Sequence, residues 1–502
     1  MHLNPENFVF IAAILLFFSV LAGRAGYRFG LPALLLFLGV GMFFGCDGPL
    51  PFLRIQFSSP GAAQFIGVIA LSIILFSGGM DTKFQDIKPV IAPGIVLATL
   101  GVLLTTGFTG LFIYFICGFT PNIQLGIWES MLLAAVMSST DSASVFSILR
   151  SKGLSLKERL RPTLELESGS NDPMAYMLTI ILIQIIQMGE FSFWSFIATL
   201  LMQMCIGAVA GYLFGKVAVA ALNRLNVQNQ SLYSILLLAF IFFIFSFTNM
   251  LKGNGYLAVY LAGLVVGNAK VVHRRSMATF FDGFTWLFQI VMFLTLGLLV
   301  TPSQMPPIIG IGLVIGLFVI ILARPVSIFI CLLPFKKLST RARLYISWVG
   351  LRGAAPIIFA TYPVIAGVQH STEMFNIVFF ITFISLLVQG TTVGVMAKWL
   401  GLIAPNKGGK NFDVQLPEEI KSSMSEIEIN DTTLANGSRL MDMTLPDNTL
   451  AVMVKRENNF FVPKGHTVLK TGDKLLVISD NEEALKQAYE SLGIKNYSIE
   501  KN

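Results

Sequence analysis

From residue 7 to residue 400 the chain alternates between long apolar runs and short polar loops. A helix needs roughly 20 apolar residues to cross a bilayer, and the runs approach that length. They lie at 7–22, 31–46, 62–79, 90–118, 130–149, 166–188, 193–222, 231–249, 255–268, 279–300, 307–334, 342–367 and 374–400. The run 255–268 is short and also fits a re-entrant or tilted segment. The pattern predicts an all-α polytopic membrane protein with about thirteen transmembrane helices.

The basic residues of the loops predict the orientation of these helices. One set of alternate loops holds eighteen of them: Arg24, Arg28, Lys83, Lys88, Arg150, Lys152, Lys157, Arg159, Arg161, Lys216, Arg224, Lys270, Arg274, Arg275, Lys336, Lys337, Arg341 and Arg343. The opposite loops hold only Arg54 and Lys252. Because cytoplasmic loops are enriched in Lys and Arg, we expect the N-terminus outside a cell (plasma) membrane and the C-terminal region in the cytoplasm.

Composition agrees with a membrane domain followed by a polar tail. The chain of 502 residues is 54% hydrophobic and 13% charged, whereas soluble domains carry about 25% charged residues. The charges become dense only after Lys407. We therefore predict a membrane domain at 1–403, a linker at 404–415 and a cytoplasmic domain at 416–502. The net charge of +7 is spread over short loops, which argues against nucleic acid as a partner.

Turn residues divide the tail into short alternating apolar runs. These predict strands at 425–429, 449–455, 460–463 and 474–479, followed by a helix at 481–492. The tail is thus expected to be a small α+β domain, and its polarity excludes a further membrane span.

Ionisable side chains inside membrane spans are costly, so each one indicates function. The first group is Ser138-Ser139-Thr140-Asp141-Ser142, at the centre of the fifth run. Hydroxyl side chains compete for backbone groups and favour local unwinding. A broken helix here would present carbonyl groups and Asp141 to a cation, as in the midplane sites of transporters. The alternative is a helix–helix contact held by hydroxyls, which leaves Asp141 unexplained.

The second group, Glu165-Leu166-Glu167-Ser168-Gly169-Ser170-Asn171-Asp172-Pro173, opens the sixth run. On a helix Ser168 and Asp172 share one face, and Glu167 and Asn171 share the adjacent face. Pro173 cannot donate a backbone hydrogen bond to Gly169, which predicts a kink with a free carbonyl acceptor. The alternative places these acids in a cytoplasmic loop, with the span beginning at residue 174.

The third group is Gly350-Leu351-Arg352-Gly353-Ala354-Ala355-Pro356, in the twelfth run. Arg352 is a permanent cation and requires a buried anion or a water-filled cavity. The alternative is that Arg352 snorkels to the interface. Interruptions in the fifth and twelfth runs fit two inverted repeats formed by runs 4–6 and 11–13, with two broken crossing helices.

Other chemistries lack a motif in this sequence. There is no nucleotide-binding P-loop, and the four histidines and four cysteines show no metal-binding or disulfide spacing. There is also no Thr-Val-Gly-Tyr-Gly filter of the kind found in potassium channels. We therefore expect neither an enzyme nor a resident cofactor.

With these motifs in view, residues 5–402 resemble the NhaP-type cation/proton antiporters, which are related to the eukaryotic sodium/proton exchangers. The resemblance depends on the Thr-Asp of the fifth run, the Glu-Ser-x-x-Asn-Asp of the sixth and the Gly-Leu-Arg-Gly-Ala of the twelfth. It implies the NhaA-like antiporter fold, a homodimer and, from the Asn-Asp pair, electroneutral exchange. One departure is Phe76-Ser77-Gly78-Gly79, where many relatives have Phe-Glu-Gly-Gly. This difference puts in doubt a further sodium-favouring carboxylate.

The resemblance also implies roles for individual residues. Asp172 would hold the cation and the proton in turn, and Thr140, Asp141 and Ser168 would line the ion site. The monovalent cation itself would contact Asp172, Ser168 and Thr140. Asn171 would hold the crossing helices together, and Glu167 would pair with Arg352.

The tail, from about residue 416 to 496, resembles the C-terminal regulatory module of potassium-transport proteins (TrkA-C or RCK-C). The similarity depends on Gly437-Ser438-Arg439-Leu440, Val462-Pro463 and Thr471-Gly472-Asp473-Lys474-Leu475. It implies a dimerising, ligand-binding domain, with cyclic di-AMP as one candidate ligand, and favours potassium over sodium.

The sequence thus predicts an antiporter that exchanges K⁺ or Na⁺ for H⁺ by alternating access. A ligand-gated cation channel is the alternative, because modules like this tail also gate channels. A membrane receptor is a third reading, but it leaves Asp141, Asp172 and Arg352 unexplained.

Overall fold

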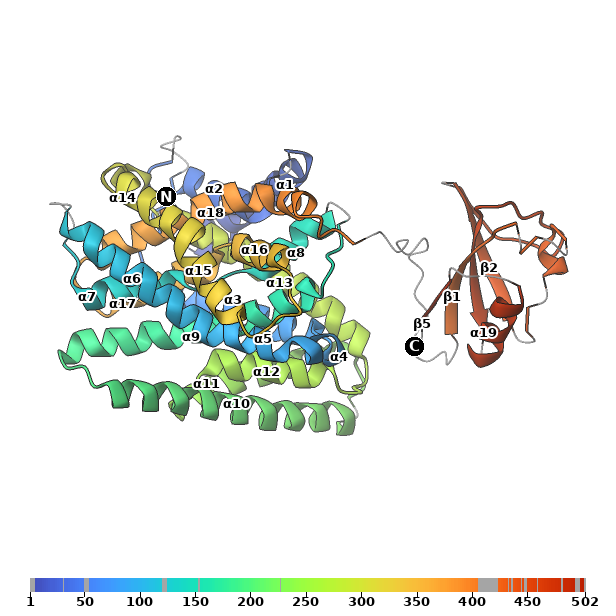
Figure 1. The fold of residues 1–502 in the computed structure, drawn as a ribbon, viewed down its shortest axis with the longest axis horizontal. Helices are drawn as coiled ribbons and strands as arrows, with labels where there is room; N and C mark the ends of the chain where they lie inside the picture. The colour runs from blue at the N-terminus through green and yellow to red at the C-terminus, as the bar shows by residue number, and fades with distance from the viewer. Residues whose placement is uncertain are drawn as a thin grey trace. The chain divides into compact units, whose positions relative to one another are not determined.

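The computed structural model divides the chain into two compact units, Met1–Ala404 and Pro405–Asn502 (Figure 1). It describes residues 5–29, 31–48, 54–119, 124–151, 154–225 and 227–404 of the first unit. In the second unit it describes 423–431, 433–434, 437–443, 445–446, 449–457, 459–479, 482–492 and 497–500. The predicted linker, 404–415, lies outside the described residues except for its first residue.

The described part of the first unit is helical. Its first half contains α1 (Pro5–Phe29), α2 (Ala33–Phe44), α3 (Pro60–Asp81), α4 (Phe84–Ile87), α5 (Ile91–Val96), α6 (Val102–Gly118), α7 (Ile127–Met137), α8 (Ser142–Ser151) and α9 (Leu160–Met188). Its second half contains α10 (Phe193–Arg224), α11 (Ser231–Met250), α12 (Gly255–Gly267), α13 (Arg274–Leu299), α14 (Pro306–Phe318), α15 (Arg324–Leu332), α16 (Thr340–Trp348), α17 (Ala354–Ile365) and α18 (Ser371–Trp399). Short 3₁₀ turns at Lys88–Val90 and Pro302–Gln304 precede α5 and α14.

Two π-helical segments join helices that otherwise continue one another. Leu97–Gly101 joins α5 to α6, and Val319–Ala323 joins α14 to α15. Within the described residues eight helices are long and apolar enough to cross a membrane. The prediction of a polytopic helical membrane protein is therefore confirmed.

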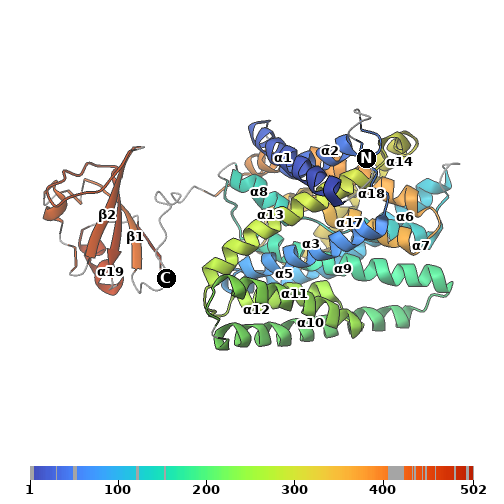
Figure 2. The ribbon, with the colours of Figure 1, turned by 180° about the vertical axis from the view of Figure 1, so that it is seen from behind.

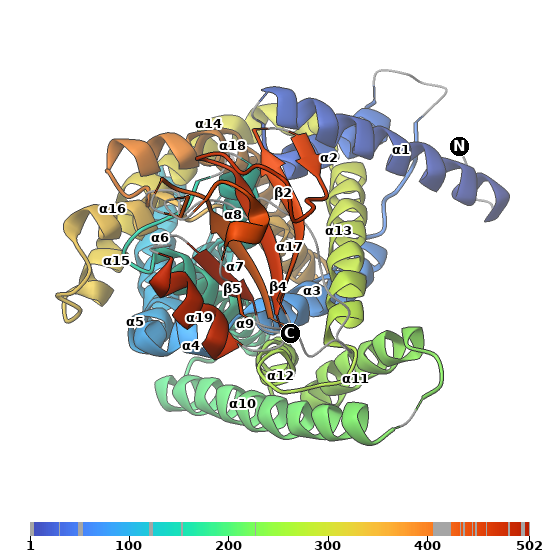
Figure 3. The same cartoon turned by 90° about the vertical axis from the view of Figure 1, so that its right-hand side faces the viewer.

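The helices pack as two bundles. The flanking bundle comprises α1, α2, α3 and α10 to α13, in which α12 packs against α3 and α10, and α13 packs against α2 and α3. The crossing bundle comprises α4 to α9 and α14 to α18, in which α7 packs against α6 and α9, and α18 packs against α14 and α17. In Figure 3, α10, α11 and α12 lie together along one edge of the first unit, away from α14 and α16. Seen from behind, α13 lies across α3 and α17, where the bundles meet (Figure 2).

Close backbone contacts hold the flanking bundle together. A Cβ at Gly263 of α12 would lie 3.0 Å from the carbonyl carbon of Phe76 in α3. A Cβ at Gly211 of α10 would lie 2.9 Å from the Cα of Ala258 in α12. Small residues let helix backbones approach in a membrane, where packing replaces the hydrophobic effect as the driving force. These positions of the flanking bundle admit only glycine.

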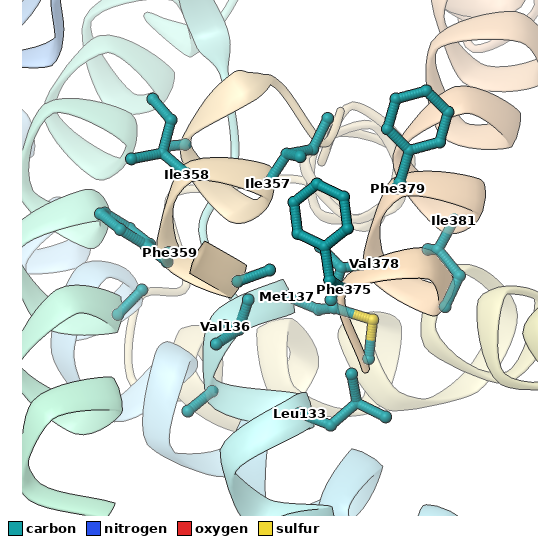
Figure 4. Packing of buried hydrophobic residues seen from close by; sticks show 14 of the residues in the cluster. Leu133, Val136, Met137, Ile357, Ile358, Phe359, Phe375, Val378, Phe379 and Ile381 are labelled. Atoms are coloured by element: carbon teal, nitrogen blue, oxygen red, sulfur yellow. The ribbon is translucent and has the colours of Figure 1, made fainter. Parts of the chain in front are cut away.

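The crossing bundle is filled by large apolar side chains around its two interrupted helices. Figure 4 shows side chains of α7, α17 and α18 converging, among them Met137, Ile357 and Phe375. The chain leaves helical geometry at 138–141, between α7 and α8, and again at 349–353, between α16 and α17. Both predicted interruptions are therefore present.

The described tail contains a five-stranded antiparallel sheet. Its strands are β1 (Ser423–Glu428), β2 (Thr449–Arg456), β3 (Asn459–Phe461), β4 (Lys474–Ser479) and β5 (Tyr497–Glu500), in the order β3-β2-β4-β1-β5. Helix α19 (Glu482–Ser491) contributes Leu485 and Tyr489 to an apolar core that includes Val454 and Val477 of the sheet. The four predicted strands overlap β1 to β4 with shifts of up to two residues at their ends, and β5 was not predicted.

Candidate functional site

The two helix interruptions touch one another at the centre of the crossing bundle. The backbone N–H of Asp141 donates to the carbonyl oxygen of Leu351 over 2.8 Å. The Arg352 Nη1 donates to the carbonyl of Ser139, also over 2.8 Å. A Cβ at Gly353 would lie 2.6 Å from Oδ2 of Asp141, so only glycine lets the two segments approach this closely.

Helix α9 binds the first interruption through three side chains on neighbouring turns. Ser168 Oγ donates to the carbonyl of Thr140 over 2.9 Å and accepts from the backbone N–H of Ser142 over 3.0 Å. Asn171 Nδ2 donates to the hydroxyl of Thr140. Asp172 accepts a hydrogen bond from the hydroxyl of Ser139. These contacts replace the backbone hydrogen bonds that the unwound segment has given up.

The two carboxylates of this region have different surroundings. Asp141 accepts from the backbone N–H of Ser144 over 3.1 Å and from its hydroxyl, so Asp141 caps the N-terminus of α8. Asp172 is 8% exposed and faces the same cavity as Asp141. The hydrogen bond from Ser139 occupies one carboxylate oxygen of Asp172, and the carboxylate has further lone pairs for a cation or a proton.

Arginine side chains meet the C-terminal ends of both interrupted helices. Arg352 binds a carbonyl just beyond the end of α7, and Arg324 Nη2 lies 3.3 Å from the carbonyl of Ile346 in α16. The C-terminal end of a helix carries partial negative charge, which a cation stabilises. The carbonyl of Trp348, also in α16, accepts from Gln389 Nε2 over 2.7 Å. The ends of the broken helices are thus satisfied inside the protein, as a lipid environment requires.

The ion pair of Glu167 corrects one prediction. Glu167 Oε1 lies 2.9 Å from Nη2 of Arg324, and both residues are buried. The predicted direct pairing of Glu167 with Arg352 is wrong, because the guanidinium of Arg352 instead donates to the carbonyl of Ser139. The sequence contains a signal for Arg324, which is a lone arginine in the apolar run 307–334. Arg324 is therefore a site residue that was not predicted.

Two of the alternative interpretations of the sequence also fail. Glu167, Asn171 and Asp172 lie within α9, which begins at Leu160, so they are not in a loop that precedes the helix. Arg352 is 2% exposed and hydrogen-bonded in the bundle centre, so it does not snorkel to an interface. Ser139, whose role had not been predicted, donates its hydroxyl to Asp172 and accepts from Arg352 at its carbonyl.

A cavity of about 660 Å³ leads to Asp172. From α9 it is lined only by the N-terminal half, from Arg161 to Asp172. Its other walls include the C-terminal end of α3, at Ser77 and Gly78, and the N-terminal half of α13, at Asp282. The cavity therefore separates the two bundles on one side of Asp172.

Buried charges at the crossing of two interrupted helices, at the end of an open cavity, are the features of a membrane transporter for small ions. The chain belongs to the sodium/hydrogen exchanger family: the model of the transmembrane sodium/hydrogen exchanger matches residues 11–399.

Individual relatives agree with this assignment. The chain is 38% identical over 494 residues to the K(+)/H(+) antiporter NhaP2 of Shewanella baltica, covering 96% of this chain and 83% of that protein. It is 38% identical over 475 residues to the K(+)/H(+) antiporter NhaP of Alkalimonas amylolytica, covering 94% and 80%. These relatives are transporters, which confirms the prediction of an antiporter over a channel or an enzyme.

A solved structure shares the fold. The sodium proton antiporter MjNhaP1 of Methanocaldococcus jannaschii at pH 8 superposes with a TM-score of 0.66 at 21% identity. The match covers 78% of this chain and 98% of MjNhaP1.

Proposed function

We propose that the protein exchanges K⁺ for H⁺ across the cell membrane, with Asp172 holding the cation and the proton in turn. Na⁺ is the alternative cation. The observation that carries the proposal is the position of Asp172, which is buried beside the crossing of two interrupted helices and faces an open cavity. Binding a cation and binding a proton at one carboxylate are mutually exclusive, and this competition couples the two fluxes.

Oxygen atoms around Asp172 form the proposed cation site. Ser168 lies one turn before Asp172 on α9, and its hydroxyl donates to the carbonyl of Thr140 in the interruption. Oxygen atoms of Ser168 and Thr140 can therefore complete the coordination of the cation. Asp141 caps α8 and contributes negative charge to the same cavity. Asn171 holds α9 to the interruption between α7 and α8. The buried ion pair of Glu167 and Arg324 joins α9 to α15 and is proposed to stabilise the site.

The first unit fits thirteen membrane crossings and two inverted repeats. The eight long apolar helices are accompanied by four shorter apolar helices and by α9, whose polar residues gather at the site. Each proposed repeat contains a π-helical segment, Leu97–Gly101 or Val319–Ala323, before its interrupted helix. The clustering of basic residues in alternate loops supports an external N-terminus and a cytoplasmic tail. The cavity then opens to the cytoplasm, and this conformation is inward-facing.

The second unit is proposed to be an RCK-C-like regulatory domain that senses a cytosolic ligand, with cyclic di-AMP as a candidate, in a homodimeric transporter. The described sheet and α19 support a separate folded unit. Deleting residues from 411 onward should preserve exchange but change its dependence on ligand and pH. Transport by full-length and truncated protein, assayed side by side with cytosolic nucleotides, tests this. Identical profiles would contradict a regulatory role.

The exchange itself is tested in proteoliposomes. Proton flux is measured while external K⁺, Na⁺, Li⁺ and Rb⁺ are supplied in turn, at several pH values and with the membrane potential clamped. We expect K⁺ to drive proton flux, with an apparent affinity that weakens as pH falls, because protons compete at Asp172. Cation affinity that does not change with pH would contradict the shared carboxylate, and ohmic current without proton coupling would contradict exchange.

A further inference from the structure

The N-terminus of α12 contacts α9 immediately beyond the ion site. Asn254 Nδ2, in the flanking bundle, donates to the carbonyl of Pro173 in the crossing bundle over 2.7 Å. The same side chain accepts from the backbone N–H of Leu257 over 2.9 Å, so it also caps α12. Asn254 has no exposed surface. A buried side chain thus joins the two bundles next to Asp172.

Aromatic rings continue this contact by one turn. Tyr256 of α12 has its ring centroid 4.9 Å from that of Tyr176 in α9, with the rings nearly perpendicular. Tyr176 also lies 5.5 Å from Tyr362 of α17, and Tyr256 lies 6.3 Å from Phe359 of α17. The two contacts of Tyr176 are edge-to-face, an arrangement that is favourable at these distances. The rings come from both bundles and pack against one another where α9, α12 and α17 meet.

The position of this cluster relative to the cavity indicates its role. The cavity follows α9 from Arg161 to Asp172, and Tyr176 lies one turn further on the same helix face. Of the described residues that line the cavity, Tyr260 is the only tyrosine, and it lies on α12 one turn beyond Tyr256. Asp172 therefore lies between open space on one side and packed aromatic rings on the other.

We propose that Asn254 and Tyr256 form a releasable latch and seal, which closes the far side of the ion site while the cavity is open. This inference rests on the proposed exchange function, because alternating access requires one path to close while the other opens. The contact is made by the side chains of Asn254 and Tyr256, unlike the contacts of α12 with α3 and α10, in which backbone meets backbone. It can therefore break and re-form when the bundles move, and Asn254 acts on transport as a positioning residue.

Two cysteine reporters distinguish a latch from a merely structural contact. The four native cysteines (Cys46, Cys117, Cys205 and Cys331) are first replaced by alanine. Gly78→Cys reports on the cavity, because a Cβ at Gly78 meets nothing within 4 Å. Thr179→Cys reports on the sealed side, because Thr179 is buried on the α9 stripe that contains Asp172 and Tyr176. Each is labelled with a thiosulfonate reagent in full-length protein without an ion gradient.

Asn254→Ser retains a capping hydroxyl but is too short to reach Pro173. We expect it to raise the labelling rate of Thr179→Cys about two- to tenfold, the range for one net hydrogen bond. Labelling of Gly78→Cys should stay equal or fall. Tyr256→Leu should raise Thr179→Cys labelling similarly, whereas Tyr256→Phe, which keeps the ring, should leave it unchanged.

Asn249→Ser is the matched control. Asn249 Oδ1 accepts from the backbone N–H of Gly255 over 3.2 Å, a contact within the flanking bundle, so this variant should leave both labelling rates at parental values. Equal labelling in Asn254→Ser and Asn249→Ser would overturn the latch, as would a Thr179→Cys that stays unlabelled in every variant. Because labelling needs no transport, failure of the latch is distinguishable from failure of exchange, which the proteoliposome assay of the parent reports.

Discussion

The flanking and crossing bundles solve the problem of packing in a membrane in opposite ways. Helices of the flanking bundle touch backbone to backbone at small residues, as at Gly263 of α12 and Gly211 of α10. The crossing bundle instead interrupts two of its helices and buries Asp172, Glu167, Arg324 and Arg352. Its interruptions are held by side-chain hydrogen bonds to backbone groups.

This difference indicates that the flanking bundle is a rigid frame and that the crossing bundle carries the ionisable groups. Backbone contacts through glycine tolerate no added atom and leave no polar group to exchange partners, so they suit a fixed frame. Buried carboxylates are costly in a membrane, and those of the described membrane unit lie in the crossing bundle, where the cation site is proposed. Side-chain contacts between the bundles, such as Asn254 with Pro173, can change partners when one bundle moves.

The largest expected effect is on transport and comes from the crossing bundle. Asp172→Asn should reduce cation-driven proton flux to the level of empty liposomes, because an amide can neither release a proton nor neutralise a cation. Proton flux in proteoliposomes measures this. Asp282→Asn is the control, since Asp282 lines the same cavity but is exposed on α13, and this variant should retain exchange. Parental exchange in Asp172→Asn at neutral pH would refute the assignment.

The next effect concerns the buried ion pair. Glu167→Gln or Arg324→Met alone should lower stability by roughly 3–5 kcal/mol, because each strands a buried charge. The double variant should recover part of that loss, as measured by thermal unfolding in detergent. Arg161 and Glu165 provide the control: they form a 2.8 Å pair on the same helix but are much more exposed, so their coupling should be at most about 0.5 kcal/mol. Strictly additive losses for Glu167 and Arg324 would show that the two charges are not coupled.

A smaller effect tests the flanking bundle. Gly263→Val should destabilise the protein by about 1–3 kcal/mol, because the new side chain meets the backbone of Phe76. Thermal unfolding and size-exclusion chromatography measure the loss. Gly78→Ala lies on α3 where a Cβ meets nothing and should be tolerated. If both variants unfold at the same temperature, close backbone packing is not what makes this bundle rigid.

The smallest effect concerns an ion pair of the tail in which Arg456 is partly exposed and Asp473 is buried. In the tail, Arg456 binds Asp473 through Nε–Oδ1 and Nη2–Oδ2 contacts of 2.8 and 2.6 Å. Burial alone would raise the pKa of Asp473, but hydrogen bonds from Arg456 and from the Lys470 backbone outweigh it and hold the pKa below its usual value. Because the pKa of Asp473 is lower in the folded tail than in the unfolded chain, the ionised carboxylate stabilises the fold at pH values above the unfolded-state pKa of about 3.9. This stabilisation is lost as the pH falls through the folded-state pKa.

Asp473→Asn should therefore cost the purified tail on the order of 1 kcal/mol at neutral pH, with a smaller cost at acidic pH. Urea unfolding at pH 7 and pH 3.5 measures both values. Glu457→Gln, which alters a neighbouring carboxylate for which no ion pair is described, serves as the control. An equal loss at both pH values would show that Asp473 stabilises the tail without its charge.

Much of this site could be predicted from residue patterns alone. Hydroxyl residues and a carboxylate at mid-span predicted the unwound segment between α7 and α8, and the four-residue spacing of Ser168 and Asp172 predicted a polar face on α9. These predictions succeed because a lipid environment leaves few explanations for a polar group within an apolar run. Ionisable groups in such runs can be recognised before any contact is known. Arg324 obeys the same rule as Arg352, because it is also a single charge inside an apolar run, but it was not predicted as a site residue.

Which buried side chains bind one another, by contrast, depends on the tertiary structure. From the sequence Glu167 was paired with Arg352, but the fold places Arg324 of α15 2.9 Å from Glu167, while Arg352 donates to the carbonyl of Ser139 just beyond the end of α7. Asn254 is an ordinary helix cap until folding brings α12 beside Pro173. Local pattern determines which groups are buried because burial depends on the length and polarity of each run. Which buried groups meet depends on how distant helices cross, and no local pattern carries that information.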